Sequence, residues 1–173
     1  YKYEIINSRT ESSALLISTL RNHPHSIKTV VSASAIGWYG TDPSPRKIGF
    51  VETDQPDAGF LGDTCKLWEE SIEPVKALGI RLVKIRTGIV LDNEGGALPE
   101  FRKPIQFGIA GILGNGKQVV SWIHIGDLCK LYIDAIENGE LNGVYNAVAP
   151  NPVTNKELTI ALAKELKGKF YIP

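Results

Sequence analysis

The chain has 173 residues, a length that fits one domain, and its composition of 43% hydrophobic and 22% charged residues is typical of a globular protein. The 19 basic and 19 acidic residues leave no net charge, which argues against a general nucleic-acid binder or a protein bound to anionic membranes, because both need a basic surface. No apolar run reaches the ~18 residues of a membrane-spanning helix.

The first part of the chain predicts a helix, a strand and a long loop. A helix is expected over 2–22, where residues three or four apart would share one face: Ile5, Arg9, Ser12, Leu16 and Leu20. A short β-branched strand is expected over Ile27–Ser32. The segment from Gly37 to Gly59 is rich in Gly, Pro and Asp and predicts a loop, and loops of this length inside compact domains are usually functional.

The middle of the chain predicts a second helix followed by two strands. The helix is expected over 62–78, with an inward stripe of Cys65, Trp68, Ile72 and Val75. Gly79 stands where a left-handed helix cap is usual. Strands are expected over Ile80–Ile85 and Ile89–Leu91.

The last part continues the alternation of helices and strands. Helices are expected over 97–108 and 127–138, and strands over 118–123 and 144–147. Thr154 and Glu157 form a capping box that begins a last helix, with an inward stripe of Leu158, Ala161, Leu162 and Leu166. This alternation predicts an α/β fold with a parallel sheet, whose ligands bind at the carboxyl ends of the strands.

Three strand ends therefore mark the expected site, after Ser32, Ile85 and Ile123. At the first of them Ser34 offers a hydroxyl that can bind a ligand carbonyl. The alternative is that these serines only cap the strand end, since serine favours turns for local reasons.

Several motifs, in order, carry a resemblance to a known family. They are Ser32–Gly40, Leu82–Leu91, Gly114–Gln118, Ser121–Leu128, Gly143–Asn146 and Ala149–Asn155. Together they resemble the extended short-chain dehydrogenase/reductase superfamily, and within it the atypical epimerase-family proteins labelled nucleoside-diphosphate-sugar epimerase-like. The resemblance implies a Rossmann-like parallel sheet with flanking helices, and residues 1–173 as the later part of a single NAD(P)-binding domain with substrate-side elements.

A Gly-rich phosphate-binding turn is absent from the 173 residues. In the family that turn lies near the N-terminus, and the chain also continues past the equivalent of Pro173. The resemblance therefore implies a sequence incomplete at both ends, which lacks the first nucleotide-binding portion and retains the nicotinamide and substrate side. The expected cofactor is NADP or NAD.

The family's Tyr-x-x-x-Lys pair is also missing. Two registers are available, Leu61-x-x-x-Cys65 and Gly62-x-x-x-Lys66, and neither contains tyrosine. Cys65 shares the inward stripe, whereas Lys66 is rotated about 100° away, so we place Cys65 at the lysine position. In the family, tyrosine moves a proton as hydride moves, and lysine binds the cofactor ribose.

Other residues acquire expected roles from the resemblance. Arg9 replaces a family asparagine and would contact a cofactor or substrate anion, the alternative being a salt bridge to an internal carboxylate. Ser34, Cys65 and the backbone of Thr87, Gly88, Ile89 and Val90 are the other expected cofactor contacts.

Catalysis would fall to Ser34, which polarises a carbonyl, and Tyr39, as a substitute acid or a substrate contact, with simple packing as the alternative. Lys117 would meet a substrate diphosphate, whereas Arg86 is expected to be structural. The sequence contains no Cys/His cluster, so no metal site is expected.

Two functions remain open. One is an NAD(P)-binding oxidoreductase or epimerase-like enzyme acting on a sugar nucleotide or other polar small molecule. The other is a non-catalytic dinucleotide-binding sensor or scaffold. The expected partner is a small molecule, without nucleic acid or membrane, and a homodimer is a further expectation. Two cysteines are too few for a disulfide scaffold and predict a reducing compartment, the cytoplasm or the mitochondrial matrix.

Overall fold

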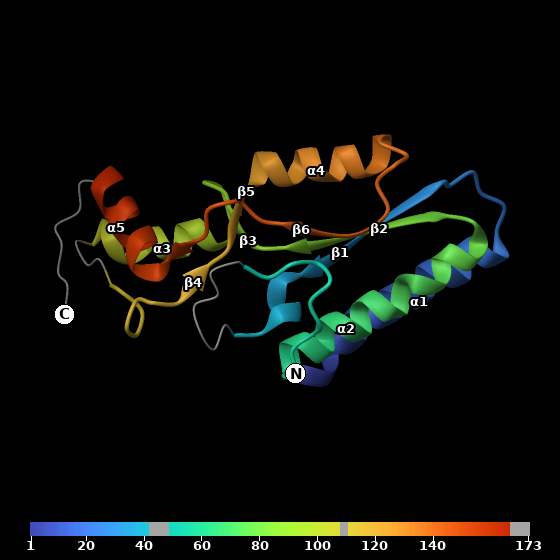
Figure 1. Ribbon diagram of the computed structural model, residues 1–173, viewed down its shortest axis with the longest axis horizontal. Helices are drawn as coiled ribbons and strands as arrows, with labels where there is room; N and C mark the ends of the chain where they lie inside the picture. Colours follow the sequence, from blue (N-terminus) through green and yellow to red (C-terminus); the bar gives the residue numbers. More distant parts are fainter. Residues whose placement is uncertain (42–48, 108–110, 167–173) are drawn as a thin grey trace. The chain divides into compact units, whose positions relative to one another are not determined.

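The computed structural model describes residues 1–41, 49–107 and 111–166, which form helices and short strands (Figure 1). The described residues fall into two compact units, one within 1–87 and 130–146, the other within 88–129 and 147–166. Among the described residues, no helix has the length and apolar character needed to cross a membrane. The interpretation of 1–173 as the later part of one domain stays a prediction.

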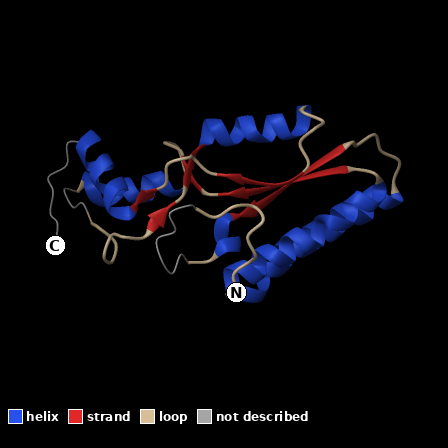
Figure 2. Cartoon of the chain, viewed as in Figure 1, coloured by secondary structure: helices blue, strands red, loops and turns tan. Residues whose placement is uncertain are grey.

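The first unit contains a three-stranded sheet in the order β1-β2-β6, drawn in red in Figure 2. The strands are β1 (Thr29–Ala35), β2 (Arg81–Thr87) and β6 (Gly143–Ala147). β1 and β2 are parallel, and their register places Ser34 opposite Arg86. Side chains from both carboxyl ends therefore meet at one edge of the sheet, as expected for a parallel α/β fold.

Helices cover both faces of this sheet (Figure 1). On one face lie α1 (Lys2–Asn22) and α2 (Phe60–Ile72), the latter extended by the 3₁₀ helix η2 (Glu73–Leu78), and on the other lies α4 (Ile125–Glu137). The core beneath α1 and α2 consists of Ile17, Leu20, Ile72, Val75, Ile80 and Leu82. The predicted α/β class with a helix-flanked parallel sheet is confirmed.

The buried face of α1 differs from the predicted stripe. Ser13, Ile17 and Leu20 are buried, whereas Leu16 is 37% exposed. Apolar residues occur on more than one face of this helix, so periodicity allows several stripes and packing against α2 selects one. On α2 the predicted inward positions Cys65 and Ile72 are buried, and Gly79 caps η2 with the expected left-handed backbone, φ 74°.

Two strand boundaries and the long loop also differ from expectation. β1 and β2 each end later than predicted, at Ala35 and Thr87, because the parallel pairing of the two strands continues to these residues. The expected loop begins inside a 3₁₀ helix, η1 (Ile36–Tyr39). Residues 42–48 of that loop lie outside the described residues.

The second unit contains two small sheets. β3 (Ile89–Leu91) pairs with β5 (Trp122–His124) in parallel, and β4 (Val119–Val120) pairs with β7 (Val153–Thr154) antiparallel. The predicted strand over 118–123 is thus divided at Ser121, whose carbonyl accepts the Ile89 N–H at 2.8 Å. Neither the antiparallel pair nor β7 was expected.

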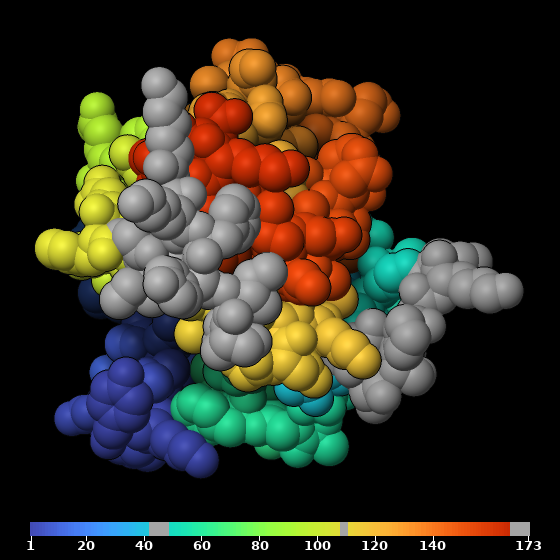
Figure 3. Space-filling model, turned by 90° about the vertical axis from the view of Figure 1, so that its left-hand side faces the viewer, coloured from blue at the N-terminus to red at the C-terminus, as the bar shows by residue number. Residues whose placement is uncertain are grey.

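The helices of the second unit are α3 (Ala97–Gln106) and α5 (Asn155–Glu165), and they pack through Ile105 and Ala163. The predicted capping box at the start of α5 is confirmed. Its buried face consists of Asn155, Leu158, Thr159 and Ala163, so only Leu158 of the predicted stripe is fully buried. Figure 3 shows α5, in red, at the surface of the molecule.

Candidate functional site

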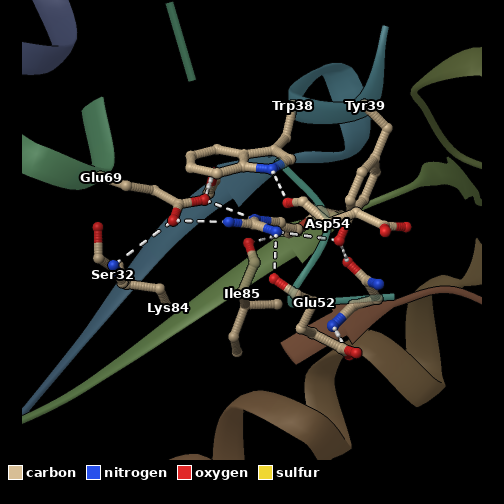
Figure 4. A network of polar contacts seen from close by, with 12 residues as sticks. Ser32, Trp38, Tyr39, Glu52, Asp54, Glu69, Lys84 and Ile85 are labelled. Atoms are coloured by element: carbon tan, nitrogen blue, oxygen red, sulfur yellow. Dashed lines mark hydrogen bonds and ion pairs between the residues drawn. The ribbon is translucent and has the colours of Figure 1, made fainter. Parts of the chain in front are cut away.

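A buried ion pair lies at the carboxyl ends of β1 and β2 (Figure 4). Arg86 on β2 donates from Nε to Glu69 Oε1 at 2.8 Å and from Nη2 to Oε2 at 3.1 Å. Both side chains are almost fully buried, at 2% and 4% exposure. A charge this deep is tolerated only when it is paired, and the two-point geometry suits a guanidinium facing a carboxylate.

Two further side chains bind the same carboxylate. Ser34 Oγ donates to Glu69 Oε1 at 2.7 Å, and Lys84 Nζ lies 3.5 Å from Oε2. Lys84 also pairs with Glu73 at 2.6 Å, at the more exposed margin of the cluster. The register explains this arrangement, since alternate residues of β2 point to one face and bring Lys84 and Arg86 against α2.

The other end of Arg86 reaches the turn that follows β1. Nη1 donates to Tyr39 Oη at 3.0 Å and to the Glu52 carbonyl at 3.1 Å. The Trp38 ring lies over the guanidinium, 3.6 Å from Cζ to the ring centroid. The Tyr39 hydroxyl in turn donates a hydrogen bond to Asn146 Oδ1 on β6 at 2.7 Å.

Burial and charge set the protonation of this cluster. Burial raises the pKa of Tyr39, and the Arg86 and Asn146 hydrogen bonds only partly offset it. Burial opposes the charge of Arg86, but its bonds to Glu69 and Tyr39 outweigh that effect and raise its pKa. At neutral pH Tyr39 therefore keeps its proton and Arg86 its charge.

Residues 50–57, which we name the strap, lie against this turn. The Phe50 ring stacks on Tyr39 with centroids 4.8 Å apart. Trp38 Nε1 donates to the Asp54 carbonyl at 2.9 Å, and the Asp57 N–H donates to the Trp38 carbonyl at 2.8 Å. The Asn146 N–H donates to Glu52 Oε1 at 2.8 Å. The strap thus joins η1, β2 and β6 of the first unit.

Cys65 lies one helical turn before Glu69 on α2. It is buried, and a Cβ on Gly37 would lie 3.5 Å from its Sγ. Burial raises the pKa of the thiol, partly offset by a hydrogen bond from the Ala35 backbone. Lys66 instead points outward and lies 3.9 Å from Glu70. The predicted inward orientation of Cys65 is confirmed, and it faces the same end of β1 as Ser34.

Arg9 is half-buried on α1, where its guanidinium lies 5.0 Å from the centroid of Trp68. Nη1 donates to the Ile5 carbonyl at 2.8 Å and contacts Ser8 Oγ at 3.4 Å. Among residues 1–41, 49–107 and 111–166 no carboxylate pairs with Arg9, so the internal salt bridge that was the alternative reading does not occur there.

The remaining predicted contacts follow the end of β2. Thr87 Oγ1 lies 3.5 Å from the Ile85 carbonyl oxygen. Thr87 also forms a hydrogen bond with Tyr132; burial raises the pKa of Tyr132, and this hydrogen bond partly offsets the rise. In the second unit, the Gly88 N–H donates to the Ala147 carbonyl at 3.1 Å, and the Ile89 N–H is bonded to Ser121. These two amides therefore already have backbone acceptors.

Two further residues of the predicted set belong to the second unit. Val90 pairs with Ile123 in the β3–β5 ladder. Lys117 is exposed, and its backbone N–H donates to Asn115 Oδ1 at 3.0 Å. The part of the chain that the structure describes contains no group of three or more His, Cys, Asp or Glu arranged to hold a metal ion.

Known proteins similar to this chain align with nearly its whole length. No family model matches it. It is 34% identical over 172 residues to the epimerase family protein YfhF of Bacillus subtilis, covering 99% of the chain and 56% of YfhF. It is 31% identical over 175 residues to the human epimerase family protein SDR39U1, covering 100% of the chain and 58% of that protein.

The crystal structure of human SDR39U1 (isoform 2) with NADPH superposes with a TM-score of 0.89 at 30% identity, over 99% of this chain and 57% of that one. A nucleoside-diphosphate sugar epimerase from Corynebacterium glutamicum gives 0.83 at 34% identity, over 97% of this chain and 37% of that one. The predicted resemblance to epimerase family proteins is confirmed. The chain spans little more than half the length of these two curated epimerase family proteins.

A more distant epimerase shares the fold alone. The UDP-glucose 4-epimerase of Thermus thermophilus, solved with NAD, has a TM-score of 0.73 at 18% identity, over 93% of this chain and 55% of that one. It supports the Rossmann-like assignment of the sheet.

Sequence reasoning missed the residues that connect this site. Ser34 and Tyr39 were expected there, but Glu69 was not considered, and Arg86 was expected to be only structural. One signal was available for Glu69, because it follows Cys65 by four residues and so shares the inward face of its helix. Nothing comparable marks Asn146 or Glu52, which reach the site through the strap and β6.

Proposed function

We propose that the protein is an NAD(P)-binding oxidoreductase or epimerase-like enzyme that acts on a sugar nucleotide or another polar small molecule. The observation that carries this proposal is the likeness to human SDR39U1, solved with NADPH, over 99% of the chain at 30% identity. When bound, NADP or NAD would supply or accept the hydride. The protein's own residues would orient the ligand and manage the proton.

Arg9 fits the cofactor side of this proposal. Its guanidinium is half-buried, and no carboxylate among the described residues neutralises it. A cation in this state suits an anionic group such as a phosphate, which it can bind in two-point geometry. Ser34, Cys65, Thr87, Gly88, Ile89 and Val90 are the other proposed cofactor residues. Since the Gly88 and Ile89 amides have backbone acceptors, their contribution would be shape or carbonyl contacts.

Ser34 and Tyr39 are the proposed catalytic residues. Because the pKa of Tyr39 is raised, its phenol is protonated at neutral pH, the state that a general acid requires. The Tyr39 proton now points to Asn146 and the Ser34 proton to Glu69, so each hydroxyl would have to turn toward a substrate carbonyl. Lys117, which is exposed, is the proposed contact for a substrate diphosphate.

The alternative is a dinucleotide-binding protein without catalysis. Two observations favour it: neither register around Cys65 contains tyrosine, and each candidate hydroxyl already donates to a side chain of the protein itself. Losing a positioned acid costs about 10²- to 10⁴-fold in rate, which slows a reaction without abolishing it. The two readings therefore differ in turnover and agree on binding.

The experiment titrates the full-length protein with NADPH and then follows NADPH oxidation across a panel of carbonyl compounds and sugar nucleotides. We expect NADPH binding that R9M weakens, because the substitution removes a cation, and turnover that both S34A and Y39F reduce. NADPH affinity should stay unchanged in Y39F, because Tyr39 is not a proposed cofactor contact. Binding without turnover on any compound would support the non-catalytic alternative, and no binding of NADPH or NADH would refute both. Elution volume on a sizing column tests the proposed homodimer in the same preparation.

A further inference from the structure

Arg86 connects its own strand, β2, to three other segments of the first unit. It belongs to β2, pairs with Glu69 on α2, lies under Trp38 and donates to Tyr39 on η1, and donates to the Glu52 carbonyl in the strap. Its side chain is only 2% exposed, so Arg86 is not an ordinary surface arginine.

Stability alone does not account for this arrangement. A buried ion pair gains little over an apolar pair of the same volume, because removing both charges from water offsets most of their attraction. What an apolar pair cannot do is direct hydrogen atoms. Here Glu69 accepts a hydrogen bond from the Ser34 hydroxyl. Arg86 donates a hydrogen bond to the Tyr39 oxygen, so the Tyr39 hydroxyl hydrogen points to Asn146. One ion pair therefore orients both candidate hydroxyls.

The strap depends on the same arginine. Three hydrogen bonds hold it. Arg86 donates to the Glu52 carbonyl, the Trp38 indole N–H donates to the Asp54 carbonyl, and the Asp57 N–H donates to the Trp38 carbonyl. Trp38 is itself stacked on the guanidinium. Gly40 makes room for Asp57, because a Cβ at Gly40 would collide with the Asp57 side chain. Removing the guanidinium would take away one strap contact directly and the support of two others.

We propose that Arg86 is a positioning residue that latches the strap to η1 and, through Glu69 and Tyr39, sets the direction of the two hydroxyls at the end of β1. The link to ligand binding rests on the proposed function, whereas the latch itself does not. Arg86 acts through these neighbours and is not proposed to touch a ligand.

Two backbone amides report on the latch. The Asp57 N–H donates to the Trp38 carbonyl and the Asn146 N–H donates to Glu52 Oε1, so both hydrogen bonds are lost when the strap moves away. In R86K the charge remains, but one ammonium group cannot bind Glu69 at two points and still reach Tyr39 and Glu52. We expect hydrogen exchange at both amides of the full-length protein to accelerate about tenfold, while exchange at Gly79, bonded to Lys76 at the far end of α2 and η2, stays unchanged.

R81K is the matched control, because Arg81 lies on the same strand and donates four hydrogen bonds to partners that exclude the strap. It should leave exchange at Asp57 and Asn146 within twofold of wild type. Should R86K fold too poorly for measurement, E69Q keeps the shape of the pair, removes its charge and should accelerate the same two amides about threefold. Equal acceleration at Gly79, or no acceleration at Asp57 and Asn146 in either variant, would overturn the latch.

The ligand arm separates this proposal from the proposed function. We expect R86K to weaken NADPH binding about tenfold and R81K less than twofold, because misplacing site groups by an ångström costs binding and rate alike. If wild type binds no NADPH, the proposed function fails and the exchange rates still decide the latch. If NADPH binds equally well to both variants while the strap amides accelerate, the latch exists but the positioning role is refuted.

Discussion

The two ends of β2 carry an arginine each and use it in different ways. Arg81, at the amino end, donates to the carbonyls of Ala135 at 2.8 Å, Leu141 at 2.7 Å and Ile136 at 3.0 Å, and to Thr29 Oγ1 at 2.9 Å. All its acceptors are neutral, and most are backbone groups at or beyond the last turn of α4. Arg86, at the carboxyl end, has a carboxylate, a phenol and a loop carbonyl as partners.

The difference separates a structural arginine from a positioning one. A cation at a helix C-terminus satisfies carbonyls that have no partner within the helix and complements the helix dipole. Arg81 therefore secures α4 to the sheet and orients no side chain that carries chemistry. Arg86 holds two candidate hydroxyls and the strap. Residue type and strand alone do not distinguish the two roles, but the identity of the acceptors does.

The largest expected effect is that of R86M. It leaves Glu69 buried with only Lys84 as a cationic neighbour at 3.5 Å, and breaking a buried pair by removing one partner costs about 3–5 kcal/mol. Urea unfolding should show this loss. The double variant R86M/E69L removes both charges and should recover most of the stability while leaving the strap amides unprotected. If the double variant is no more stable than R86M, the unpaired carboxylate is not the cause.

R81M should cost less, about 1.5–3 kcal/mol, because the acceptors of Arg81 are neutral carbonyls and one hydroxyl. Hydrogen exchange should localise the change to the end of α4, where the Asn138 N–H donates to the Asp134 carbonyl at 2.9 Å. The Asp57 amide should be unaffected. Acceleration at Asp57 would mean that the two ends of β2 are coupled and would weaken the comparison.

T154A calibrates what a pure helix-capping contact contributes. Thr154 accepts from the Glu157 N–H at 3.2 Å at the start of α5, and losing such a cap typically costs about 1 kcal/mol. Thermal unfolding of T154S, which keeps the hydroxyl, provides the matched control and should resemble wild type. A loss as large as that of R86M would contradict the view that capping and ion-pair burial differ in scale.

The smallest expected effect concerns Glu73, at the exposed margin of the ion-pair cluster. Burial opposes its charge, but Lys76 and Lys84 outweigh that effect and lower its pKa. A group whose pKa is lower in the folded state stabilises the protein above its unfolded pKa, near 4.3, and loses that contribution as pH falls through the folded value. Unfolding measured from pH 6 to pH 3 should therefore depend on pH less steeply in E73Q. Identical slopes would show that Glu73 does not contribute.

The sequence predicted the two candidate hydroxyls without predicting what holds them. Ser34 and Tyr39 stand out because they follow a strand and resemble a family motif. Their partners lie far away in the chain, since Ser34 and Glu69 are separated by 35 residues and Tyr39 and Asn146 by 107. Such pairs depend on strand register and on the path of the strap, which periodicity does not report.

Local signals determined the features that need only neighbouring residues. The helix over 2–22, the left-handed cap at Gly79 and the capping box at Thr154 follow from hydrogen bonds and backbone angles within a few residues, so the sequence alone predicted them correctly. The tertiary structure decided which helix faces are buried and which acceptor each β2 arginine meets. It placed Ser34 opposite Arg86 through the β1–β2 register and divided the strand expected over 118–123. The physical reason is that packing and ion pairing depend on groups distant in sequence, whereas helix capping depends on groups only a few residues apart.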